Sequence, residues 1–289
     1  MEEESGSFLG ARQSELFWQC WRPRGARAVL AIVHGLGEHC GRYQNVVDAV
    51  SGMPVAVWGF DLRGFGRSTG SRGHVDSFWD YLEDIDHFLH LVHQREGQDG
   101  NRPEASLPVF LLGHSYGGLI ALHYAISRPG CLAGLILASP CLGLAMVVPR
   151  WKQNLAHFLS RLRPRFSMSS RLDPDLLSRD EEVVRAYIAD PLVHDRVSAR
   201  LFADMQWAME RAARKAVQLR CPCLMLLGER DGIVSTPVCQ NVFVRLGSAD
   251  KELALYPGLY HELFNEVGKE GPLGKLRGWV SARLDRGPS

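Results

Sequence analysis

The sequence predicts an α/β fold built on a mostly parallel sheet, and two observations lead to this prediction. Short apolar runs without polar alternation recur along the chain, and such runs suit strands buried on both faces of a parallel sheet. Helical patterns lie between these runs, and strand alternating with helix is typical of the α/β class. The expected strands are 29–34, 55–61, 108–114, 132–139, 223–229 and 252–257.

Two helices are clear among the segments between the strands. In 75–92, apolar residues recur at steps of three and four, which places them on one face of a helix. A second helix leaves from Tyr116 and ends before Pro129. Between about residues 143 and 217 the alternation gives way to helical periodicity, so we expect a helical cap inserted over one edge of the sheet. The expected organisation is two core segments around this cap: 1–142, 143–217 and 218–289.

Composition narrows the class of protein. The chain has 289 residues, enough for one large core, and its 33 Lys and Arg nearly balance 32 Asp and Glu. A net charge of +1 gives no general reason to expect nucleic acid as a partner. No run of about 18 apolar residues occurs, and the acidic N-terminus lacks the apolar stretch of a signal peptide. We therefore read the seven cysteines as reduced, buried thiols and expect a cytoplasmic protein.

The pentapeptide GHSYG, which begins at Gly113, carries the first chemical signal. It matches G-x-S-x-G, and it stands where an apolar run leads into Ser115 and a helix leaves from Tyr116. This strand–turn–helix context is that of a nucleophile elbow. A turn this sharp strains the serine backbone, and side chains at Gly113 and Gly117 would clash with neighbouring backbone. We read His114, the neighbour of the serine, as structural.

A serine hydroxyl needs a general base held by an acid, and the chain offers both in the order Ser, Asp, His. Asp231 follows the expected strand 223–229, and His261 follows 252–257. Functional residues of open α/β sheets gather at the carboxyl ends of the strands, so a triad with Ser115 is expected there. The alternatives are that Asp231, which precedes a glycine, only forms a turn, and that His261 is an ordinary loop histidine.

The glycine-bearing loop after the first expected strand reads AIVHGLGEH. Gly35, Gly37 and Gly41 are spaced one residue too widely for the dinucleotide fingerprint G-x-G-x-x-G. In a serine hydrolase the same place supplies a backbone N–H to the oxyanion hole, paired with the N–H after the nucleophile. We therefore expect oxyanion donors at Leu36 and Tyr116.

No metal site is expected from the sequence. The segment HELFN resembles the zinc motif H-E-x-x-H, but Asn265 stands where the second histidine is required. His87, His90 and His93 are spaced by three on a helix, and we favour a solvated face there over a metal site. We expect neither a metal nor an organic cofactor.

Six segments resemble a known family: HGLGEHCGRY, DLRGFGRSTGSRGH, GHSYGG, LSRDEEVVRAYIADPLVH, GERDGIV and YPGLYHELFNE. They are similar to the monoacylglycerol lipase and lysophospholipase branch of the α/β-hydrolase superfamily, of the serine aminopeptidase S33-like type. The likeness extends from about Val29 past His261 and includes the insertion. It implies an eight-stranded core with helices on both faces, a mobile helical cap over an acyl-binding pocket, and hydrolysis of esters with one fatty acyl chain.

The resemblance also implies roles for particular residues. It assigns the triad to Ser115, Asp231 and His261, and the oxyanion donors to Leu36 and Tyr116. Three further residues match positions near the polar head of the substrate: Glu38, Arg42 and Tyr187. The sequence departs from the family where Leu62 and Phe65 replace the histidines of DHRGHG, and where Tyr116 replaces Met.

These residues predict a serine hydrolase that cleaves monoacylglycerol to glycerol and free fatty acid through an acyl-enzyme. Lysophospholipase or broad carboxylesterase activity is the alternative on the same scaffold, and amide hydrolysis would use the same triad. A relative that only binds a ligand or a protein is the alternative of a different class, but such proteins usually lose a triad member. The expected partner is a lipid monoester and not a nucleic acid, and the sequence predicts no oligomeric state.

The cap contains one helix, 149–163, with a pattern of its own. Five apolar residues share one face of it: Trp151, Leu155, Phe158, Leu159 and Leu162. Five basic residues flank that face: Arg150, Lys152, Arg161, Arg163 and Arg165. The face can close on the active-site pocket, and a basic amphipathic helix can also lie on an anionic lipid surface. We expect both, and hence peripheral contact with a membrane.

Overall fold

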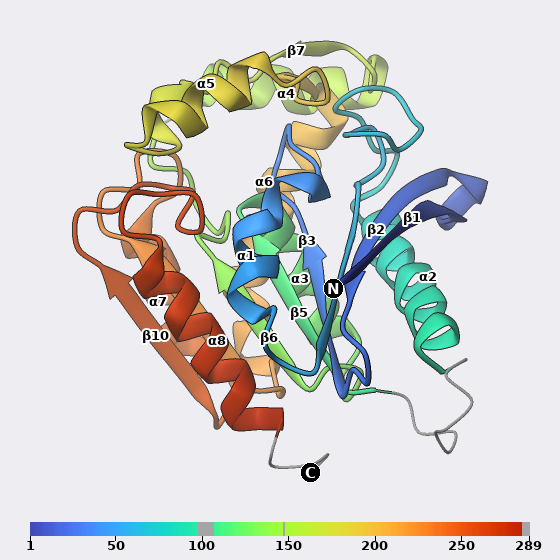
Figure 1. The fold of residues 1–289 in the computed structure, drawn as a ribbon. Coiled ribbons are helices and arrows are strands. Elements are labelled where there is room, and N and C mark those ends of the chain that lie inside the picture. The colour runs from blue at the N-terminus through green and yellow to red at the C-terminus, as the bar shows by residue number, and fades with distance from the viewer. Residues whose placement is uncertain (98–106, 147, 285–289) are drawn as a thin grey trace.

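The computed structural model describes residues 1–97, 107–146 and 148–284, and its centre is an eight-stranded sheet (Figure 1). In spatial order the strands are β1 (Glu2–Leu9), β2 (Glu15–Arg22), β4 (Val55–Phe60), β3 (Ala28–Val33), β5 (Val109–His114), β6 (Gly134–Ala138), β9 (Cys223–Gly228) and β10 (Lys251–Tyr256). The six strands from β4 to β10 run parallel, whereas β1 and β2 are antiparallel. This confirms the predicted mostly parallel α/β fold.

All six strands expected from the sequence form, with ends that differ from the expected ones by no more than two residues. Their apolar runs are buried because both faces of the sheet are covered. In β3, for example, Val29, Ala31 and Val33 join one core cluster, while Leu30 and Ile32 join the other. This alternation is the period of two that every strand imposes.

Helices cover both faces of the sheet, and each buries an apolar side on it. The helices α1 (Gln44–Val50) and α8 (Glu270–Leu284) contribute to one core cluster. The other cluster receives α2 (Phe78–Gly97), α3 (Tyr116–Ser127), α6 (Ala199–Lys215) and α7 (Thr236–Arg245). The described residues also form four short 3₁₀ turns: η1 (Ala11–Gln13), η2 (Cys40–Tyr43), η3 (Pro174–Leu176) and η4 (Ala216–Gln218).

The segment expected to form a cap lies above the sheet, on the side toward which the parallel strands run (Figure 1). It contains α4 (Arg150–Leu162), β7 (Ser167–Ser169), α5 (Glu181–Ala189) and β8 (Arg196–Ser198), and β7 pairs with β8. The last helix of the expected insertion, α6, packs against α3 and buries Leu201 and Ala208 in the core. The cap and the core are therefore joined through α6.

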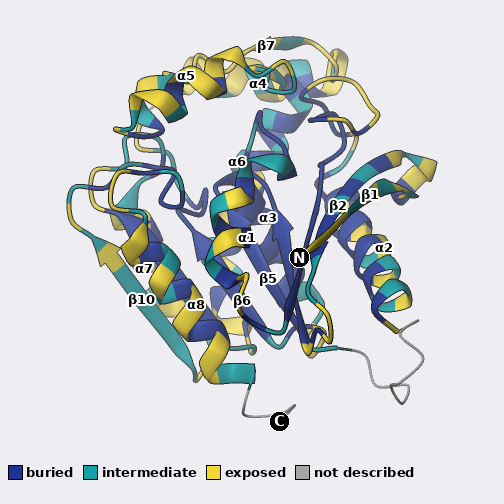
Figure 2. Ribbon diagram, viewed as in Figure 1, coloured by how far each residue is buried: buried dark blue, intermediate teal, exposed yellow. Residues whose placement is uncertain are grey.

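The helix α4 presents its apolar face to solvent. It packs on α6, and Ser160 is its one buried residue. By contrast, Trp151, Leu155, Phe158 and Leu162 are 63%, 47%, 59% and 65% exposed. Figure 2 shows that α4 and α5 at the top of the molecule are largely exposed, whereas the central strands are buried. No helix among the described residues is long and apolar enough to span a bilayer.

The seven cysteines are all free, but they are not all buried. The expectation is wrong for Cys131, which is exposed, and for Cys221, which is only partly buried. Cys131 lies beyond the C-terminal end of α3, in the turn that leads to β6, where the chain runs along the surface.

Candidate active site

Ser115 occupies a strained turn between β5 and α3. Its backbone has φ 52° and ψ −118°, in the left-handed region that residues with a side chain rarely adopt. Hydrogen bonds hold it there: its N–H donates to the Ala138 carbonyl (3.0 Å), and its own carbonyl accepts from Gly118 (3.0 Å) and Cys141 (2.8 Å). Strain of this kind persists only where the surroundings enforce it, and it marks functional positions.

The glycines around Ser115 are required by close packing. A methyl group at Gly113 would lie 2.5 Å from the carbonyl oxygen of Gly117. At Gly117 it would overlap the carbonyl oxygens of Val33 and His34, at the end of the neighbouring strand β3. The start of α3 can therefore approach β3 this closely only because Gly117 has no side chain. This close approach holds the Ser115 turn next to the loop that follows β3.

Asp231 and His261 meet above the ends of β9 and β10. The Nδ1 atom of His261 lies 2.7 Å from Oδ2 of Asp231, and both side chains are 3% exposed. Oδ1 of Asp231 accepts the backbone N–H groups of Ile233 and Val234, both at 2.9 Å. The carboxylate is thus fixed on both oxygens, and it holds the histidine ring in one orientation.

The environment of this pair favours its charged forms. Burial lowers the pKa of His261, but the carboxylates of Asp231, Glu262 and Glu38 together outweigh burial, and the net direction is upward from the ordinary value of 6.5. Burial raises the pKa of Asp231, but His261 and the two backbone donors outweigh it, and the net direction is downward. The ring can therefore accept a proton next to a carboxylate that stays ionised.

The loop of His261 lies beside the turn of Ser115. The Ser139 hydroxyl donates to the His261 carbonyl (2.8 Å). Ser139 directly follows Ala138, whose carbonyl accepts the Ser115 N–H. Among the described residues no hydrogen bond joins the Ser115 hydroxyl to the His261 ring. The ring of His114 lies against that of His261, with centroids 4.8 Å apart, and its Nδ1 bonds to the Ala138 carbonyl. Sequence reasoning had not placed His114 next to His261.

The loop after β3 packs against Ser115. A methyl group at Gly35 would come within 3.2 Å of the Ser115 Cβ, and Gly37 has a positive φ of 84°. Between these glycines stands Leu36, and Tyr116 opens α3, where the first N–H groups lack helical acceptors. No backbone acceptor in the described part of the chain takes the N–H of Leu36 or Tyr116.

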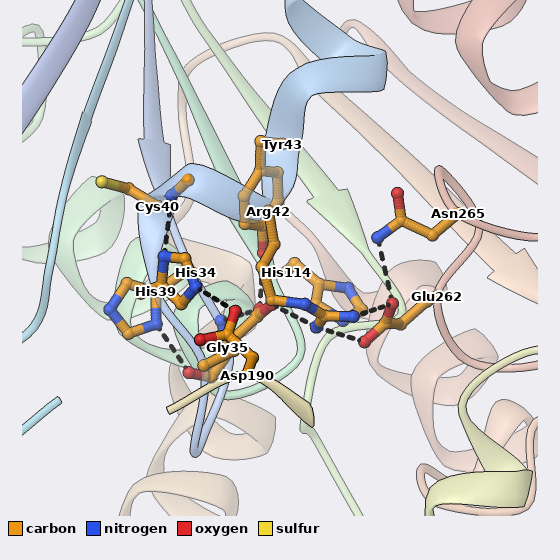
Figure 3. Close-up of polar contacts among 12 residues, drawn as sticks. His34, Gly35, His39, Cys40, Arg42, Tyr43, His114, Asp190, Glu262 and Asn265 are labelled. Atoms are coloured by element: carbon orange, nitrogen blue, oxygen red, sulfur yellow. Dashed lines mark hydrogen bonds and ion pairs between the residues drawn. The ribbon is translucent and has the colours of Figure 1, made fainter. Parts of the chain in front are cut away.

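Glu38, Arg42 and Tyr187 belong to one largely buried network, and Figure 3 shows its members Gly35, Arg42 and Tyr43. Oε1 of Glu38 accepts the Gly35 N–H (2.5 Å) and the Tyr43 hydroxyl (2.8 Å). Its Oε2 accepts Nη1 of Arg42 (2.8 Å), and the Arg42 guanidinium lies 4.7 Å from the centre of the Tyr187 ring. Burial raises the pKa of Glu38, but Arg42, together with His114, His34 and the Gly35 N–H, outweighs burial and holds the value at about 2. Contact of these residues with a substrate head group stays a prediction.

Glu262 is a member of this network that the sequence reading missed. Its two oxygens accept Nη1 and Nη2 of Arg42, at 2.6 and 2.9 Å, and Asn265 donates to the second of them (3.0 Å). The residue follows His261 directly, but its partner Arg42 is 220 positions away in the chain. The only signal in the sequence is that Glu262 directly follows His261, and this does not reveal that Glu262 pairs with Arg42.

A small pocket of about 10 Å³, with space for about one water molecule, adjoins this network. Its lining combines carboxylate, aromatic and apolar groups: Glu38, Tyr43, His114, Glu262, Leu263, Phe264 and Asn265. The pocket therefore borders the residues that directly follow His261.

In dinucleotide-binding folds an acidic residue after the second strand binds the ribose, and Asp61 stands at the corresponding place here. Asp61, which follows β4, accepts the N–H groups of Cys40 and Arg67 through its two oxygens, at 2.8 Å each. A nucleotide ribose would have to displace these donors. No group of three His, Cys, Asp or Glu residues in the described segments is arranged to hold a metal ion.

The cap contacts both loops of the candidate site. The Glu262 N–H donates to the Leu177 carbonyl (2.8 Å), and the His194 N–H donates to the Gly37 carbonyl (3.0 Å). In addition, Nε2 of His39 lies 2.8 Å from Asp190 (Figure 3). The His194 ring stacks on Phe65, one of the two departures from the DHRGHG pattern, with centroids 5.0 Å apart.

Comparisons with known proteins agree with this architecture. The family described as serine aminopeptidase, S33, matches residues 24–268. A monoacylglycerol lipase of Mycolicibacterium smegmatis is 32% identical over 280 residues, which cover 96% of this chain and 97% of that protein. A monoglyceride lipase of Rattus norvegicus is 32% identical over 277 residues, covering 93% and 88%. The crystal structure of a Paleococcus ferrophilus monoacylglycerol lipase has a TM-score of 0.81 at 33% identity, covering 98% and 100%.

One further relative differs in length. An uncharacterized abhydrolase domain-containing protein of Dictyostelium discoideum is 32% identical over 288 residues, but the chain spans only 30% of that protein. The other two relatives are matched over nearly their whole length. The chain belongs to the serine aminopeptidase S33 family and has the α/β-hydrolase fold.

Proposed function

We propose that the protein is a carboxylic ester hydrolase that cleaves monoacylglycerol to glycerol and a free fatty acid. The observation that carries the proposal is the 2.7 Å pair of His261 and Asp231 beside the strained turn of Ser115. Membership of the S33 family supports an ester hydrolase, and two relatives of this chain are named as lipases of monoacylglycerol. The substrate proposal rests on those relatives.

The mechanism that we propose is acyl transfer through Ser115. His261 takes the proton of the Ser115 hydroxyl as the oxygen attacks the ester carbonyl, and Asp231 stabilises the imidazolium. The N–H groups of Leu36 and Tyr116 hold the negative oxygen of the tetrahedral intermediate. The alcohol leaves with the proton from His261, and water then repeats the cycle to release the fatty acid.

The cap, 143–217, is proposed to deliver lipid to this site. The exposed apolar face of α4 is flanked by basic side chains, and Met146, Phe166, Met168 and Ile188 add exposed apolar area on the same segment. Exposed apolar surface of this extent marks an interaction site, and basic flanks suit anionic lipid head groups. The protein therefore takes an insoluble monoester from a membrane surface.

A fluorophosphonate probe and a substrate panel test this function. The wild-type protein should be labelled once and should hydrolyse monoacylglycerols, with 4-nitrophenyl esters and lysophospholipids of matched chain length as comparisons. Ser115→Ala should abolish labelling and lower kcat by roughly 10⁴- to 10⁶-fold. Retention of most esterase activity in Ser115→Ala would overturn the nucleophile. If a lysophospholipid or an amide is turned over faster than monoacylglycerol, the proposed substrate is wrong, but the proposed triad stands.

A further inference from the structure

Arg42 lies where two loops of the proposed active site meet. Its Nη1 donates both to Glu38, in the loop that carries Leu36, and to Glu262, in the loop that carries His261. Its Nη2 completes a bidentate pair with Glu262 (2.9 Å). One guanidinium thus connects the loop of the expected oxyanion donor to the loop of the expected base (Figure 3).

The connection continues into the backbone on both sides. Through its other oxygen, Glu38 accepts the N–H of Gly35, the residue before Leu36. On the other side, the peptide that joins Glu262 to His261 donates its N–H to Leu177 of the cap. An uninterrupted chain of hydrogen bonds and one peptide link therefore runs from Gly35 to His261.

The three ionic side chains of this chain are shielded from water. Arg42, Glu38 and Glu262 are 10%, 5% and 4% exposed. Both oxygens of each carboxylate already have protein donors. A planar guanidinium can hold two carboxylates in fixed directions, whereas the ammonium group of lysine is a single point charge on a flexible stem. The arrangement suits the holding of loops better than the recognition of a glycerol head group.

We propose that Arg42 and Glu262 are positioning residues that fix the Leu36 loop and the His261 loop relative to each other. The inference rests on the proposed function, because it assigns the two residues a part in ester hydrolysis. It differs from head-group recognition in a measurable way. A positioning residue serves every ester that Ser115 attacks, whereas a head-group residue serves only substrates that carry the head group.

The network also sets the charge around His261. Four titratable groups face this ring: Asp231, Glu262 and Glu38 favour its protonated form, and His114 packs against it. Replacing Glu262 by glutamine keeps the size of the side chain but removes one of the carboxylates that raise the pKa of His261. That pKa should fall, because the imidazolium loses a favourable neighbour.

Arg42→Lys tests the positioning role, and Arg63→Lys is its matched control. Arg63 is also buried, at 7% exposed, and also makes a bidentate pair, with Asp84 at 2.6 and 2.7 Å, but it is not part of the site. Single-turnover and steady-state kinetics would use a 4-nitrophenyl ester and a monoacylglycerol of the same chain length. We expect Arg42→Lys to lower kcat roughly 10- to 100-fold for both substrates with little change in KM, and Arg63→Lys to leave kcat unchanged.

Three results would overturn the proposal. If Arg42→Lys raises KM for monoacylglycerol alone, Arg42 binds the head group. If Arg42→Lys has the wild-type kcat on both esters, Arg42 has no positioning role. A titration of the His261 ring by NMR in Glu262→Gln gives a readout that needs no substrate: we expect a lower pKa than in wild type, and an unchanged pKa contradicts the proposal. If the wild-type protein hydrolyses no ester, the proposed function fails, while the titration still tests the network.

Discussion

Nδ1 of His261 lies 2.7 Å from Oδ2 of Asp231, although 30 residues separate them in the chain. Asp231 lies three residues beyond the end of β9, and His261 lies five residues beyond the end of β10. These strands are parallel neighbours and bring the two loops together. The second oxygen of Asp231 is held by two backbone N–H groups, so the carboxylate cannot turn away from the ring. This pair is the basis of the first two predictions.

Asp231→Asn should lower kcat by roughly 10³- to 10⁴-fold, by analogy with serine proteases. The amide keeps the shape of the side chain but cannot stabilise the imidazolium, and it favours the wrong tautomer of His261. Steady-state kinetics on a 4-nitrophenyl ester measure the loss. Asp86→Asn removes an exposed carboxylate that pairs with Arg128 on the surface, and its kcat should equal that of wild type.

The pH profile should show an acid limb above pH 6.5. In the proposed mechanism His261 must be neutral to accept the proton of Ser115. Asp231, together with Glu262 and Glu38, outweighs burial and raises the pKa of this ring above the ordinary value of 6.5. The value of kcat/KM should therefore rise as the pH increases through that raised pKa. A limb centred below pH 6.5 would mean that burial dominates over the Asp231 carboxylate.

Gly117→Ala should destabilise the protein and abolish activity. Its methyl group would overlap two backbone carbonyls of the β3 end, and neither can move without disturbing the sheet. Overpacking of this kind costs about 1–3 kcal/mol of the free energy of unfolding. Chemical denaturation measures the change.

Gly278→Ala is the control for this substitution. Gly278 lies in α8, where an added methyl group meets nothing within 4 Å. The change should stabilise the protein by about 0.4–1 kcal/mol, since alanine restricts the unfolded chain. Equal destabilisation by the two substitutions would contradict the packing argument.

Phe158→Glu should weaken binding to anionic vesicles at low salt. The Phe158 side chain is 59% exposed on the apolar face of α4, and its replacement removes apolar contact area and adds repulsion. The loss should be roughly tenfold or more in vesicle affinity, measured by sedimentation. Val244→Glu alters a similarly exposed apolar residue on α7 and should bind as wild type does. A wild-type protein that stays in the supernatant at low salt removes the membrane role.

The central strands could be predicted because each carries its own signal in the sequence. In β3, β4, β5 and β9 all six residues are buried, so the apolar run alone marks the strand. The strand β1 has no such signal. It begins with three glutamates at the sheet edge and forms through its pairing with β2, in the register Glu2 opposite Arg22 to Leu9 opposite Glu15. The resemblance implied eight strands, but the residues alone did not locate these two.

The site divides in the same way. Asp231 and His261 could be predicted because each follows a strand whose position the sequence reveals, and their pairing then follows from the neighbouring strands. The pairing of Arg42 with Glu262 could not, because a sequence shows which residues are charged but not which of them meet across 220 positions. The pairing of β7 with β8 could not be predicted either, because each strand has only three residues and its partner lies far away in the chain.

The backbone of the cap bonds to the loops beneath it at Leu177, whose carbonyl accepts a hydrogen bond, and at His194, whose N–H donates one. An engineer who grafts the cap of a relative onto this scaffold, in order to change the acyl-chain preference of the proposed hydrolase, would therefore also exchange bonds that hold the Gly37 and His261 loops. Chimeras that keep the native stretches around these two residues should retain turnover with the new preference. Chimeras that cut through either stretch should fold with unsatisfied peptide groups and turn over slowly whatever the chain length.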